Sequence, residues 1–451
     1  MPSTIRRRPP FLPVTSLLVM VAAATLAGCG ESARLAVRDG MGPAPVLPAP
    51  RTTVIPTVKI APAVGWNGTM PTPGTGLAVN ALAGDLDHPR WLYVLPNGDV
   101  LVAETNAPPR PKAAQGIRGW FMARVMQRAG AAVPSANRIT LLRDTDRDGI
   151  AETRSLFLRN LNSPFGMVLV GDTLYVADTD AVLGFPYRQG ATAIEAPARR
   201  LASLPAGPRN HHWTKSLVAS ADGRRLYVGV GSNSNIAEHG LDEEVNRAAI
   251  LEIDVATGST RVFASGLRNP VGMDWQPQGG ALWVAVNERD ELGSDVPPDY
   301  MTEVREGGFY GWPYSYFGRV DTRVRPQRPD LVATAIQPDY ALGPHTASLG
   351  LAFYDGALLP RFRDGALIGQ HGSWNRRPRS GYKVIFVPFA GGRPAGMPET
   401  VLDGFLDADG NALGRPVGVA VAGDGAVLVA DDVGNVVWRV VPERGATREA
   451  D

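Results

Sequence analysis

The sequence predicts an all-β fold, a six-bladed β-propeller with one short helical insertion. The chain of 451 residues contains 51 glycines and 39 prolines beside 44% hydrophobic residues, a composition typical of a turn-rich β-protein. One pattern also recurs weakly along the chain: a short apolar run, a turn with Gly, Asp or Asn, and a second apolar run that ends in small polar residues. Such runs around Asn-Gly, Asp-Gly and Gly-Gly turns are typical of β-hairpins.

Six copies of this pattern define the expected blades. The copies lie roughly 50 to 80 residues apart, which leaves room in each blade for two more strands. They begin at Trp91, Gly166, Ser216, Gly272, Gly350 and Gly418. A β-sandwich with insertions is the structural alternative. In a propeller the loops at one end of the strands surround a central channel, so functional residues are expected there.

One segment, residues 113–130, breaks the hairpin pattern inside the first blade. Its large apolar residues recur at roughly the spacing of a helix that turns every 3.6 residues; they are Ile117, Trp120, Phe121, Val125 and Met126. We expect a short helix that packs on the propeller, with contact to a partner or a membrane as the alternative.

Residues 1–28 predict a bacterial lipoprotein signal peptide. Arg6, Arg7 and Arg8 precede an apolar run that ends in Leu-Ala-Gly before Cys29, the only cysteine of the chain. Cys29 is the expected lipid attachment point, although a plain signal peptide with an incidental cysteine would look similar. We therefore expect an exported lipoprotein that faces the periplasm from a membrane, most naturally the outer membrane, or that lies on the cell surface. A single cysteine also excludes a disulfide framework, an iron–sulfur cluster and covalently attached haem.

The remaining chain divides into a linker, one domain and a tail. Residues 29–63 are rich in Pro and Ala without a period and are expected to form a semi-rigid tether outside the core. Residues 64–441 form the propeller, and residues 442–451 are expected to be a frayed tail. The net charge of +1, from 45 basic and 44 acidic residues, gives no reason to expect nucleic acid or an acidic membrane surface as a partner.

Two adjacent histidines, His211 and His212, lie in the stretch RNHHWTKSL directly before the third hairpin. A histidine in a loop near a channel mouth can act as a general base, because its pKa lies near neutral pH. The alternative is a hydrogen-bonded polar rim without chemistry. Arg268 and Asn269, in GLRNPVGMDW, hold the same position before the fourth hairpin.

Two stretches are rich in carboxylates, the ligands that Ca²⁺ prefers. The loop after the fourth hairpin contains Glu288, Asp290, Glu291, Asp295 and Asp299, and a solvated acidic loop is the alternative to a calcium site. The stretch DTDRDGIAE places Asp144, Asp146 and Asp148 before Gly149, like the first half of an EF-hand loop, but Ser155 stands at the twelfth position. A turn stapled by Ca²⁺ and a solvated turn both fit this stretch, and either would be structural.

Four stretches in order resemble the glucose/sorbosone dehydrogenase family, and its sorbosone branch more than its soluble glucose dehydrogenase branch. They are NHHWTKSL, GLRNPVGMDW, NERDELGSD with GGFYGWP, and GQHGSWNRRPRSGYKVIF. The resemblance runs from about His88 to Val440. It implies a six-bladed propeller that oxidises sugars with pyrroloquinoline quinone (PQQ) and Ca²⁺.

The resemblance also implies roles for the residues near the hairpins. His212 would be the catalytic base with His211 as its neighbour, and Arg268 and Asn269 would lie at the reactive carbonyl of the quinone. Arg268 would stabilise the negative charge that develops there as hydride arrives. Arg415 matches the region of the arginines that bind the cofactor carboxylates. The family's cofactor lysine has no counterpart, and Arg376 or Arg377 stands near its place; residues 162–167 replace a stretch that carries glutamine.

For the metal, the resemblance implies that backbone carbonyls of Asp290 and Glu291 hold the Ca²⁺ that polarises PQQ. Asp295 and Asp299 resemble carboxylates of a neighbouring structural calcium site, and Glu288 completes the set of candidate ligands.

We therefore expect a quinoprotein dehydrogenase that oxidises an aldose or sugar aldehyde and passes electrons to a separate cytochrome or quinone. Two other classes stay open: a six-bladed, calcium-dependent hydrolase of the lactonase type, and a binding propeller without catalysis.

Overall fold

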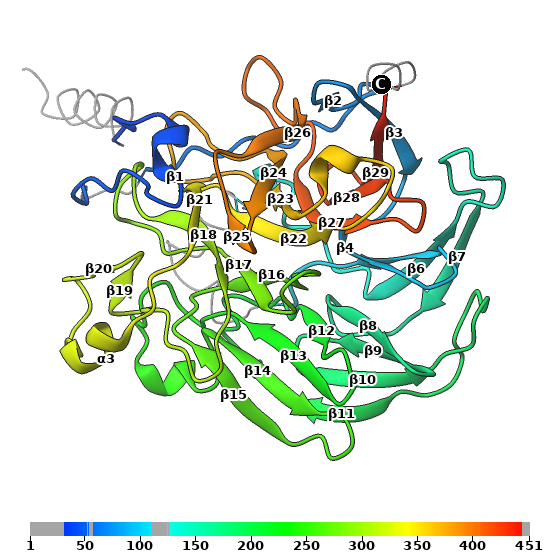
Figure 1. Cartoon of the computed structure of the whole chain (residues 1–451), viewed down its shortest axis with the longest axis horizontal. Helices are drawn as coiled ribbons and strands as arrows, with labels where there is room; N and C mark the ends of the chain where they lie inside the picture. The colour runs from blue at the N-terminus through cyan, green and yellow to red at the C-terminus, as the bar shows by residue number, and fades with distance from the viewer. Residues whose placement is uncertain (1–30, 52, 54–56, 110–123, 125, 444–451) are drawn as a thin grey trace, which may run out of the picture.

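The computed structural model describes residues 31–51, 53, 57–109, 124 and 126–443, and it confirms the six-bladed β-propeller (Figure 1). In each blade four antiparallel strands run outward from the central axis, and the innermost strands of neighbouring blades contact one another. The six hairpins that the sequence predicts are the two innermost strands of the six blades.

The first three blades follow one another along the chain without interruption of the strand order. Blade 1 contains β4 (Pro89–Val94), β5 (Val100–Glu104), β6 (Arg138–Arg143) and β7 (Thr153–Leu158). Blade 2 contains β8 (Met167–Val170), β9 (Thr173–Ala177), β10 (Ala181–Pro186) and β11 (Arg199–Ser203). Blade 3 contains β12 (Leu217–Ala219), β13 (Arg225–Val230), β14 (Ala249–Asp254) and β15 (Thr260–Ser265).

The other three blades carry additions at their outer edges. Blade 4 contains β16 (Pro270–Trp275), β17 (Leu282–Val286), β18 (Pro298–Glu303), β21 (Tyr340–Pro344) and the added β1 (Met41–Gly42). Blade 5 contains β22 (Ser348–Tyr354), β23 (Gly365–Gln370), β24 (Lys383–Ala390), β26 (Glu399–Asp403), β2 (Thr72–Pro73) and β25 (Arg393–Pro394). Blade 6 contains β27 (Pro416–Val421), β28 (Val427–Asp431), β29 (Val436–Pro442) and β3 (Leu77–Ala83).

Short elements fill the connections. A two-stranded sheet of β19 (Ser315–Tyr316) and β20 (Arg319–Val320) precedes α3 (Pro329–Thr334) between β18 and β21. Three 3₁₀ turns lie elsewhere: η1 (Val37–Gly40), η2 (Leu241–Glu244) and η3 (Pro360–Phe362). No helix in the described part of the chain is both long and apolar enough to span a bilayer.

The ring is closed by strands from both ends of the domain. β3, which precedes blade 1 in the sequence, pairs antiparallel with β29, from Ala83 opposite Val437 to Leu77 opposite Pro442. Blade 6 therefore contains three strands from the end of the domain and one from its beginning.

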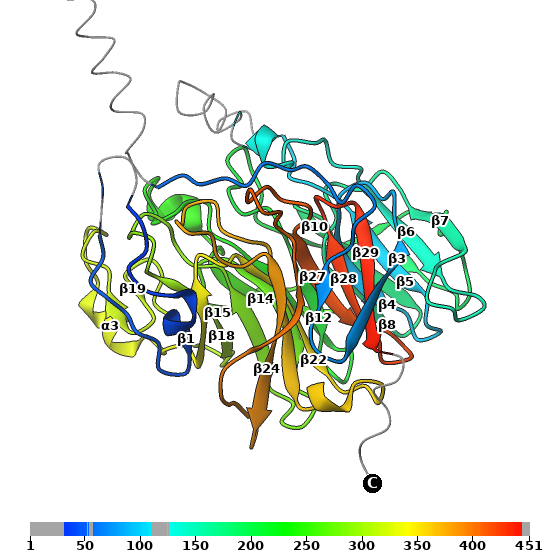
Figure 2. The ribbon, with the colours of Figure 1, turned by 90° about the horizontal axis from the view of Figure 1, so that it is seen from above.

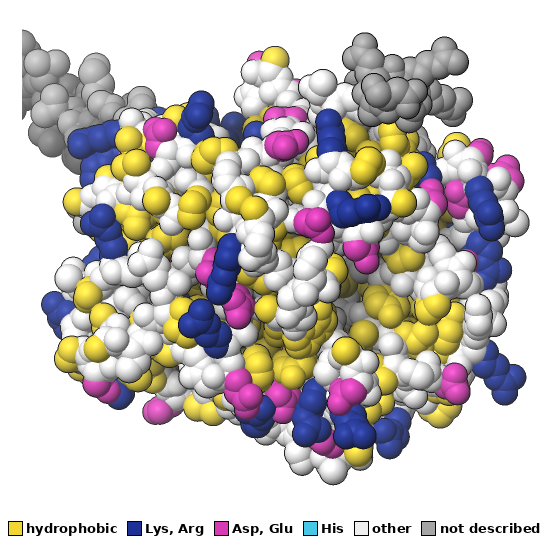
Figure 3. All heavy atoms as spheres, in the orientation of Figure 1, with side chains coloured by type: hydrophobic (Ala, Val, Ile, Leu, Met, Phe, Trp, Pro, Cys, Tyr) yellow, Lys and Arg dark blue, Asp and Glu magenta, His cyan; other side chains and the backbone are white. Residues whose placement is uncertain are grey.

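All innermost strands begin at the same face of the ring, and all second strands end there. The register shows this directly, since Pro89 pairs with Glu104 and Pro416 with Asp431. We call this side the entry face; it is the upper side of Figure 2, whereas β29 ends at the opposite side. Figures 1 and 3 view the opposite face, where Lys and Arg side chains alternate with Asp and Glu.

The glycines that start several of the hairpins allow neighbouring blades to approach each other. A methyl group added at Gly350 would collide with the backbone carbonyl of Val417 in the next blade. The same collision with the next innermost strand would occur at Gly272 and, less severely, at Gly418. The turn pattern in the sequence therefore contains a packing signal as well, because only glycine fits where two backbones nearly touch.

The expected tether differs in the structure: the described part of residues 29–63 lies on the propeller. β1 extends blade 4 as a fifth strand, with Met41 opposite Leu342, and the N–H of Lys59 donates to the carbonyl of Trp374 over 2.7 Å. The composition of this segment predicted an unpaired chain, but its backbone groups find partners along the edge of blade 4 and on the entry face. We call residues 31–63 the strap.

Other expectations are met only in part. Of the predicted helical insertion, residues 124 and 126–128 are helical, and the other residues up to 123 and residue 125 lie outside the described part. The signal peptide and Cys29 also lie outside it. At the other end, Pro442 completes β29 and Glu443 donates its N–H to Gly76, so these two residues belong to the domain rather than to the predicted tail.

Gly350→Ala should lower the free energy of unfolding by about 1–3 kcal/mol, because the new methyl group forces blades 5 and 6 apart. Urea unfolding followed by tryptophan fluorescence would measure the change. Gly84→Ala is the matched control, since a methyl group there meets no atom within 4 Å. Equal unfolding midpoints for the two variants would contradict this account of blade packing.

Candidate functional site

The candidate functional site lies at the entry face, around the mouth of the central channel. A residue just before an innermost strand, or just after a second strand, is placed there by the register of the blades. All six blades contribute a polar or charged residue at or next to such a position, and blade 2 does so through Asp178, which follows β9. The residues from the other five blades are His88, Arg90, His212, Arg268, Asn269, Glu288, His345, His371, Arg415 and Asp432.

One buried carboxylate, Asp432, holds the part of this site that blades 1, 5 and 6 form. Its Oδ2 atom lies 2.6 Å from Nη1 of Arg90 and 3.0 Å from Nε2 of His371. Nε2 of His88 lies 3.4 Å from the same oxygen. The sequence analysis identified none of these four residues as functional.

The charged groups in this cluster shift one another's pKa values. Burial alone would raise the pKa of Asp432, but His371, His88 and Arg90 together hold that pKa well below its usual range. Burial lowers the pKa of His88 to about 4, against the opposing effect of Asp432, and burial also lowers the pKa of His371. At neutral pH the cluster is therefore Asp432 in its ionised form beside neutral His88 and a charged Arg90.

Arg415 adds a second buried cation to the same region. Its guanidinium lies 5.1 Å from the ring centre of Tyr382, and one of its nitrogens donates to the carbonyl of Ala61 in the strap over 3.4 Å. The Nε atoms of both Arg415 and Arg90 are buried and have no hydrogen-bond partner among the described residues. Buried donors without partners are costly, so this region is suited to an anionic ligand that would accept from them.

His212 is oriented by the backbone of the neighbouring strand end. Its Nδ1 lies 2.9 Å from the carbonyl oxygen of Ser232 and 3.1 Å from the hydroxyl of the same residue. Because a carbonyl oxygen only accepts, Nδ1 carries the proton in the neutral ring and Nε2 is the basic nitrogen. His211 is exposed, and its ring meets that of His212 edge to face at 4.5 Å.

Arg268 is almost fully buried and is held by one residue that the sequence analysis missed, Asn235. The side-chain oxygen of Asn235 accepts from Nη2 of Arg268 over 3.0 Å and from the N–H of Asp290 over 2.9 Å. Its carbonyl accepts from Nε of Arg268 over 3.3 Å and from the indole N–H of Trp312 over 3.0 Å. Asn269, which follows Arg268, has a buried side-chain oxygen without a partner among the described residues.

The carbonyl oxygens of the acidic loop are already occupied by nitrogen donors. Nη1 of Arg268 donates to the carbonyl of Glu288 over 2.6 Å, and Nε of Arg289 donates to that of Asp290 over 2.9 Å. The carbonyl of Glu291 accepts from Arg323. A Ca²⁺ ion bound by these oxygens would have to displace the guanidinium groups.

The carboxylates of this loop do not converge either. Asp299 accepts from the N–H groups of Glu288 and Ser348, both over 2.9 Å, whereas Asp295 accepts from the N–H groups of Arg34 and Leu35 in the strap. The side chain of Asp290 accepts from Asn375 over 2.6 Å, and Glu291 lies 3.9 Å from Arg323. Burial raises the pKa of Glu288 to about 7. As folded, these oxygens are occupied by nitrogen donors and do not converge on one point, and the expected calcium ligands stay a prediction.

Arg376 also differs from its expected role at the cofactor. All its donors go to backbone carbonyls: Nε to Ser294 over 3.0 Å, Nη1 to Pro378 over 2.7 Å and Nη2 to Leu35 over 3.0 Å. It therefore ties the strap to the acidic loop. Sequence alone could not distinguish an arginine that binds carbonyls from one that binds a ligand.

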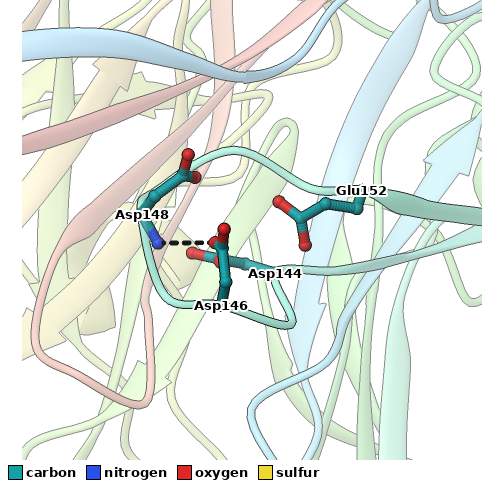
Figure 4. A group of neighbouring side chains, drawn as sticks. All are labelled: Asp144, Asp146, Asp148 and Glu152. Atoms are coloured by element: carbon teal, nitrogen blue, oxygen red, sulfur yellow. Dashed lines mark hydrogen bonds between the residues drawn. The ribbon is translucent and has the colours of Figure 1, made fainter.

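Among the described residues, the carboxylates that could hold a metal ion are Asp144, Asp146, Asp148 and Glu152, with oxygens within 4.8 Å of one another (Figure 4). They lie in the turn between β6 and β7, at the face opposite the entry face. Backbone N–H groups of the turn donate to all four carboxylates. Both alternatives stay open for this turn, and its distance from the channel mouth makes either one structural.

Comparison with known proteins identifies the relatives of this arrangement. The model of the TrAA12-like family matches residues 71–306 and 330–442. A protein of Borreliella burgdorferi without an assigned function is 33% identical over 249 residues, 54% of this chain and 64% of that protein. The pyrroloquinoline quinone-dependent pyranose dehydrogenase of Coprinopsis cinerea is 26% identical over 230 residues, 41% of this chain and 31% of that enzyme. The chain thus spans less than two thirds of the length of these relatives.

Solved structures agree in fold. The PQQ domain of the Coprinopsis cinerea pyranose dehydrogenase, in its holo form, has a TM-score of 0.67 at 20% identity, covering 85% of this chain and all of that domain. A calcium structure of a Trichoderma reesei enzyme of family AA12 has a TM-score of 0.65 at 16% identity, covering 86% of this chain and 99% of that one. The predicted resemblance is confirmed at the level of PQQ-dependent sugar dehydrogenases as relatives, and the sorbosone branch stays a prediction.

The stabilising effect of neutral, buried His88 should disappear as the pH falls. Its pKa is about 4 in the folded chain and about 6.5 when unfolded, so unfolding takes up a proton between these values. Wild-type stability relative to His88→Gln should therefore fall by up to ~3 kcal/mol between pH 7 and pH 4. Urea titrations of both proteins across this range measure the difference. If the two stability curves run parallel, the pKa of His88 is the same in the folded and unfolded chain, and burial does not lower it.

Proposed function

The chain belongs to the TrAA12-like family, and from this premise we propose that it is a PQQ-dependent dehydrogenase that oxidises an aldose or a sugar aldehyde to the lactone or acid. The observation that carries the proposal is the group of buried cations at the channel mouth. Arg90, Arg268 and Arg415 are all buried there, and Asp432 is the carboxylate that Arg90 contacts. The names of the relatives support the sugar substrate and the quinone.

The residues at the mouth fit PQQ, which is a tricarboxylate. Arg90 and Arg415 would hold its carboxylates, since both have buried Nε donors that lack partners among the described residues. Arg268 and Asn269 would lie on the other side of the mouth, next to the reacting carbonyl. When bound, PQQ supplies a quinone carbon that accepts hydride from the substrate.

The chain's own groups would then handle the proton and the charge. Nε2 of His212 would accept the hydroxyl proton of the substrate, because the bond from Nδ1 to Ser232 leaves Nε2 as the basic nitrogen. Arg268 would stabilise negative charge on the quinone oxygen, and Asn235 prevents its guanidinium from turning away. Since the oxygens of the acidic loop are occupied by nitrogen donors as folded, no step is derived through calcium.

The arrangement favours this reaction over the two alternatives. A hydrolase of the lactonase type needs carboxylates around a metal in the channel, whereas the described residues at this mouth are mostly cationic or imidazole groups. A binding propeller without catalysis gives no reason for the fixed tautomer of His212. We further propose that the electrons pass to a separate cytochrome or quinone.

We also propose that the protein is a lipoprotein, exported and anchored to a membrane through Cys29. The Leu-Ala-Gly-Cys sequence after a basic start and an apolar run supports this localisation.

His212→Ala should lower kcat by about 10²–10⁴-fold and leave PQQ binding nearly unchanged, because the residue acts on the substrate proton. Arg268→Ala should weaken PQQ binding as well as turnover. Reduction of an artificial dye by PQQ-loaded protein, with a panel of aldoses, measures kcat, and PQQ fluorescence quenching measures binding. His239→Ala is the matched control, because this histidine is exposed and bonded to Arg209. If His212→Ala keeps wild-type turnover, His211 and His212 form only a hydrogen-bonded polar rim and neither is the catalytic base.

Cys29→Ser should give a chain that no longer labels with radioactive palmitate and no longer sediments with membranes. The sequence contains no other cysteine that could take its place. Metabolic labelling followed by membrane fractionation in a bacterial host measures both properties, with Ser32→Ala as the control. A variant that still sediments like the wild type would show that the anchor lies elsewhere.

A further inference from the structure

We propose that the entry face, with the mouth of the channel, lies against the lipid bilayer. This inference rests on the lipid anchor at Cys29 proposed above, and it goes beyond that anchor by assigning which side of the propeller meets the membrane. It is independent of the sugar that the protein oxidises. The partner is the lipid surface itself.

The first observation is the position of Glu31, where the described chain begins. The N–H of Ser294 donates to the Glu31 carboxylate, which also pairs with Arg51, and the hydroxyl of Thr57 donates to the Glu31 carbonyl over 3.1 Å. Ser294 lies in the loop that follows β17, and β17 ends at the entry face. Glu31 is therefore held on the entry face.

The distance from Glu31 to the proposed lipid is short. Only Gly30 lies between Glu31 and Cys29. Two residue steps span at most about 7 Å even when fully extended. A lipid on Cys29 therefore starts within that distance of the rim of the entry face, too close for the ring to turn its opposite side to the bilayer.

Hydrogen bonds hold the strap on the propeller close to the proposed anchor. Arg376 donates to the carbonyl of Leu35 over 3.0 Å, and Asp295 accepts from the N–H groups of Arg34 and Leu35. Further along, β1 is part of blade 4. The strap would have to lose these bonds before it could act as the long flexible linker that its composition suggests.

The second observation is a set of exposed apolar side chains on the connections of the entry face. Val245 is 65% exposed and Leu241 49% exposed, at η2 in the loop after β13, and Val133 is 46% exposed in the connection after β5. Met126 in the same connection and Val64 beside Ala412 are 42% and 44% exposed. These five residues, which we call the apolar rim, come from two connections of the ring and from the segment around residue 64.

A bilayer fits the apolar rim better than a protein groove does, because the rim side chains are spread over two connections from different blades and the segment around residue 64. Burial of these side chains in the bilayer interface would add to the binding by one lipid anchor but would be too weak to hold the protein on a membrane alone. The opposite face also exposes apolar side chains, Ile150 and Met397, among its mixed charges (Figure 3). The apolar rim alone therefore does not show which face lies against the bilayer. The position of Glu31 on the entry face does.

The test uses the full lipidated chain on phosphatidylcholine vesicles whose headgroups carry an acceptor dye. Since the lipid occupies the only native cysteine, one introduced cysteine can carry the donor dye. Val245→Cys places the donor on the entry face. Arg224→Cys places it in the turn between β12 and β13 of the same blade, at the opposite face, where the side chain is 82% exposed. Both sites are on the surface, and unchanged melting curves confirm that the variants fold.

Energy transfer should be at least about twofold stronger from position 245 than from position 224, because the six residues of β13 alone separate the two ends by about 20 Å. Equal transfer, or stronger transfer from position 224, would overturn the orientation and leave the apolar rim for a protein partner. A wild-type chain that does not stay on vesicles would overturn the anchor and the orientation together. Loss of sugar oxidation with unequal transfer would instead refute only the proposed reaction.

Discussion

The pairing of β3 with β29 closes the ring, and the channel mouth depends on this closure. The seam runs between blade 6, which contains both strands, and blade 1. Arg90 and His88 belong to blade 1, and Asp432 to blade 6, so the central ion pair of the site crosses the seam. The N–H of His88 also donates to the side-chain oxygen of Asn435 over 3.1 Å. A ring that opens at this seam therefore loses the contacts between His88, Arg90 and Asp432 at the same time.

Closure also brings charged groups together in a buried place, where they shift one another's pKa values. Burial lowers the pKa of Arg90, and Arg415 lowers it further by repulsion, while Asp432 opposes both effects. One buried guanidinium group and two imidazoles thus lie around one carboxylate, and a second guanidinium group, that of Arg415, repels the first. Removing cations from water costs several kcal/mol each unless their partners compensate for it. A bound polyanion would supply the missing partners, and a ligand that binds only the closed ring stabilises that ring by mass action.

The sequence predicted the hairpins because turn chemistry is local, but it did not predict what lies between them. Asn-Gly and Asp-Gly turns are readable residue by residue, whereas the pairing of the strap with blade 4 depends on an edge formed some 300 residues later in the chain. Composition suggested a free tether, and the backbone bonds of Met41 and Lys59 show why that reading failed. Prolines and alanines do not prevent a segment from packing when a sheet edge is available.

The same limit applies to the site. His212 and Arg268 were predicted from their place before an innermost strand, and His88 and Arg415 hold that same place in blades 1 and 6. Aligning the six hairpins would therefore have pointed to His88, and the position after a second strand would have pointed to Asp432. Asn235 has no such signal, because its role depends on bonds to Arg268 and Asp290 that only the folded loops create. The acidic loop is ambiguous for a related reason: a carboxylate accepts from N–H groups as readily as it binds a metal, so its composition alone does not decide between the two.

The acidic loop shows how one cation can take the place of another. Its carbonyl oxygens are the kind of ligand that Ca²⁺ prefers. Here, however, Nη1 of Arg268 donates to the carbonyl oxygens of Asn287 and Glu288, and Nη2 lies 3.3 Å from Oδ2 of Asp290. Arg268 is part of the chain and therefore cannot diffuse away as an ion can. Its bonds to Asn235 set the orientation of its guanidinium group. The chain itself therefore supplies positive charge at this side of the mouth before any ligand arrives. Such preorganisation is what electrostatic stabilisation of a developing charge requires, because the donors need not reorient during the reaction.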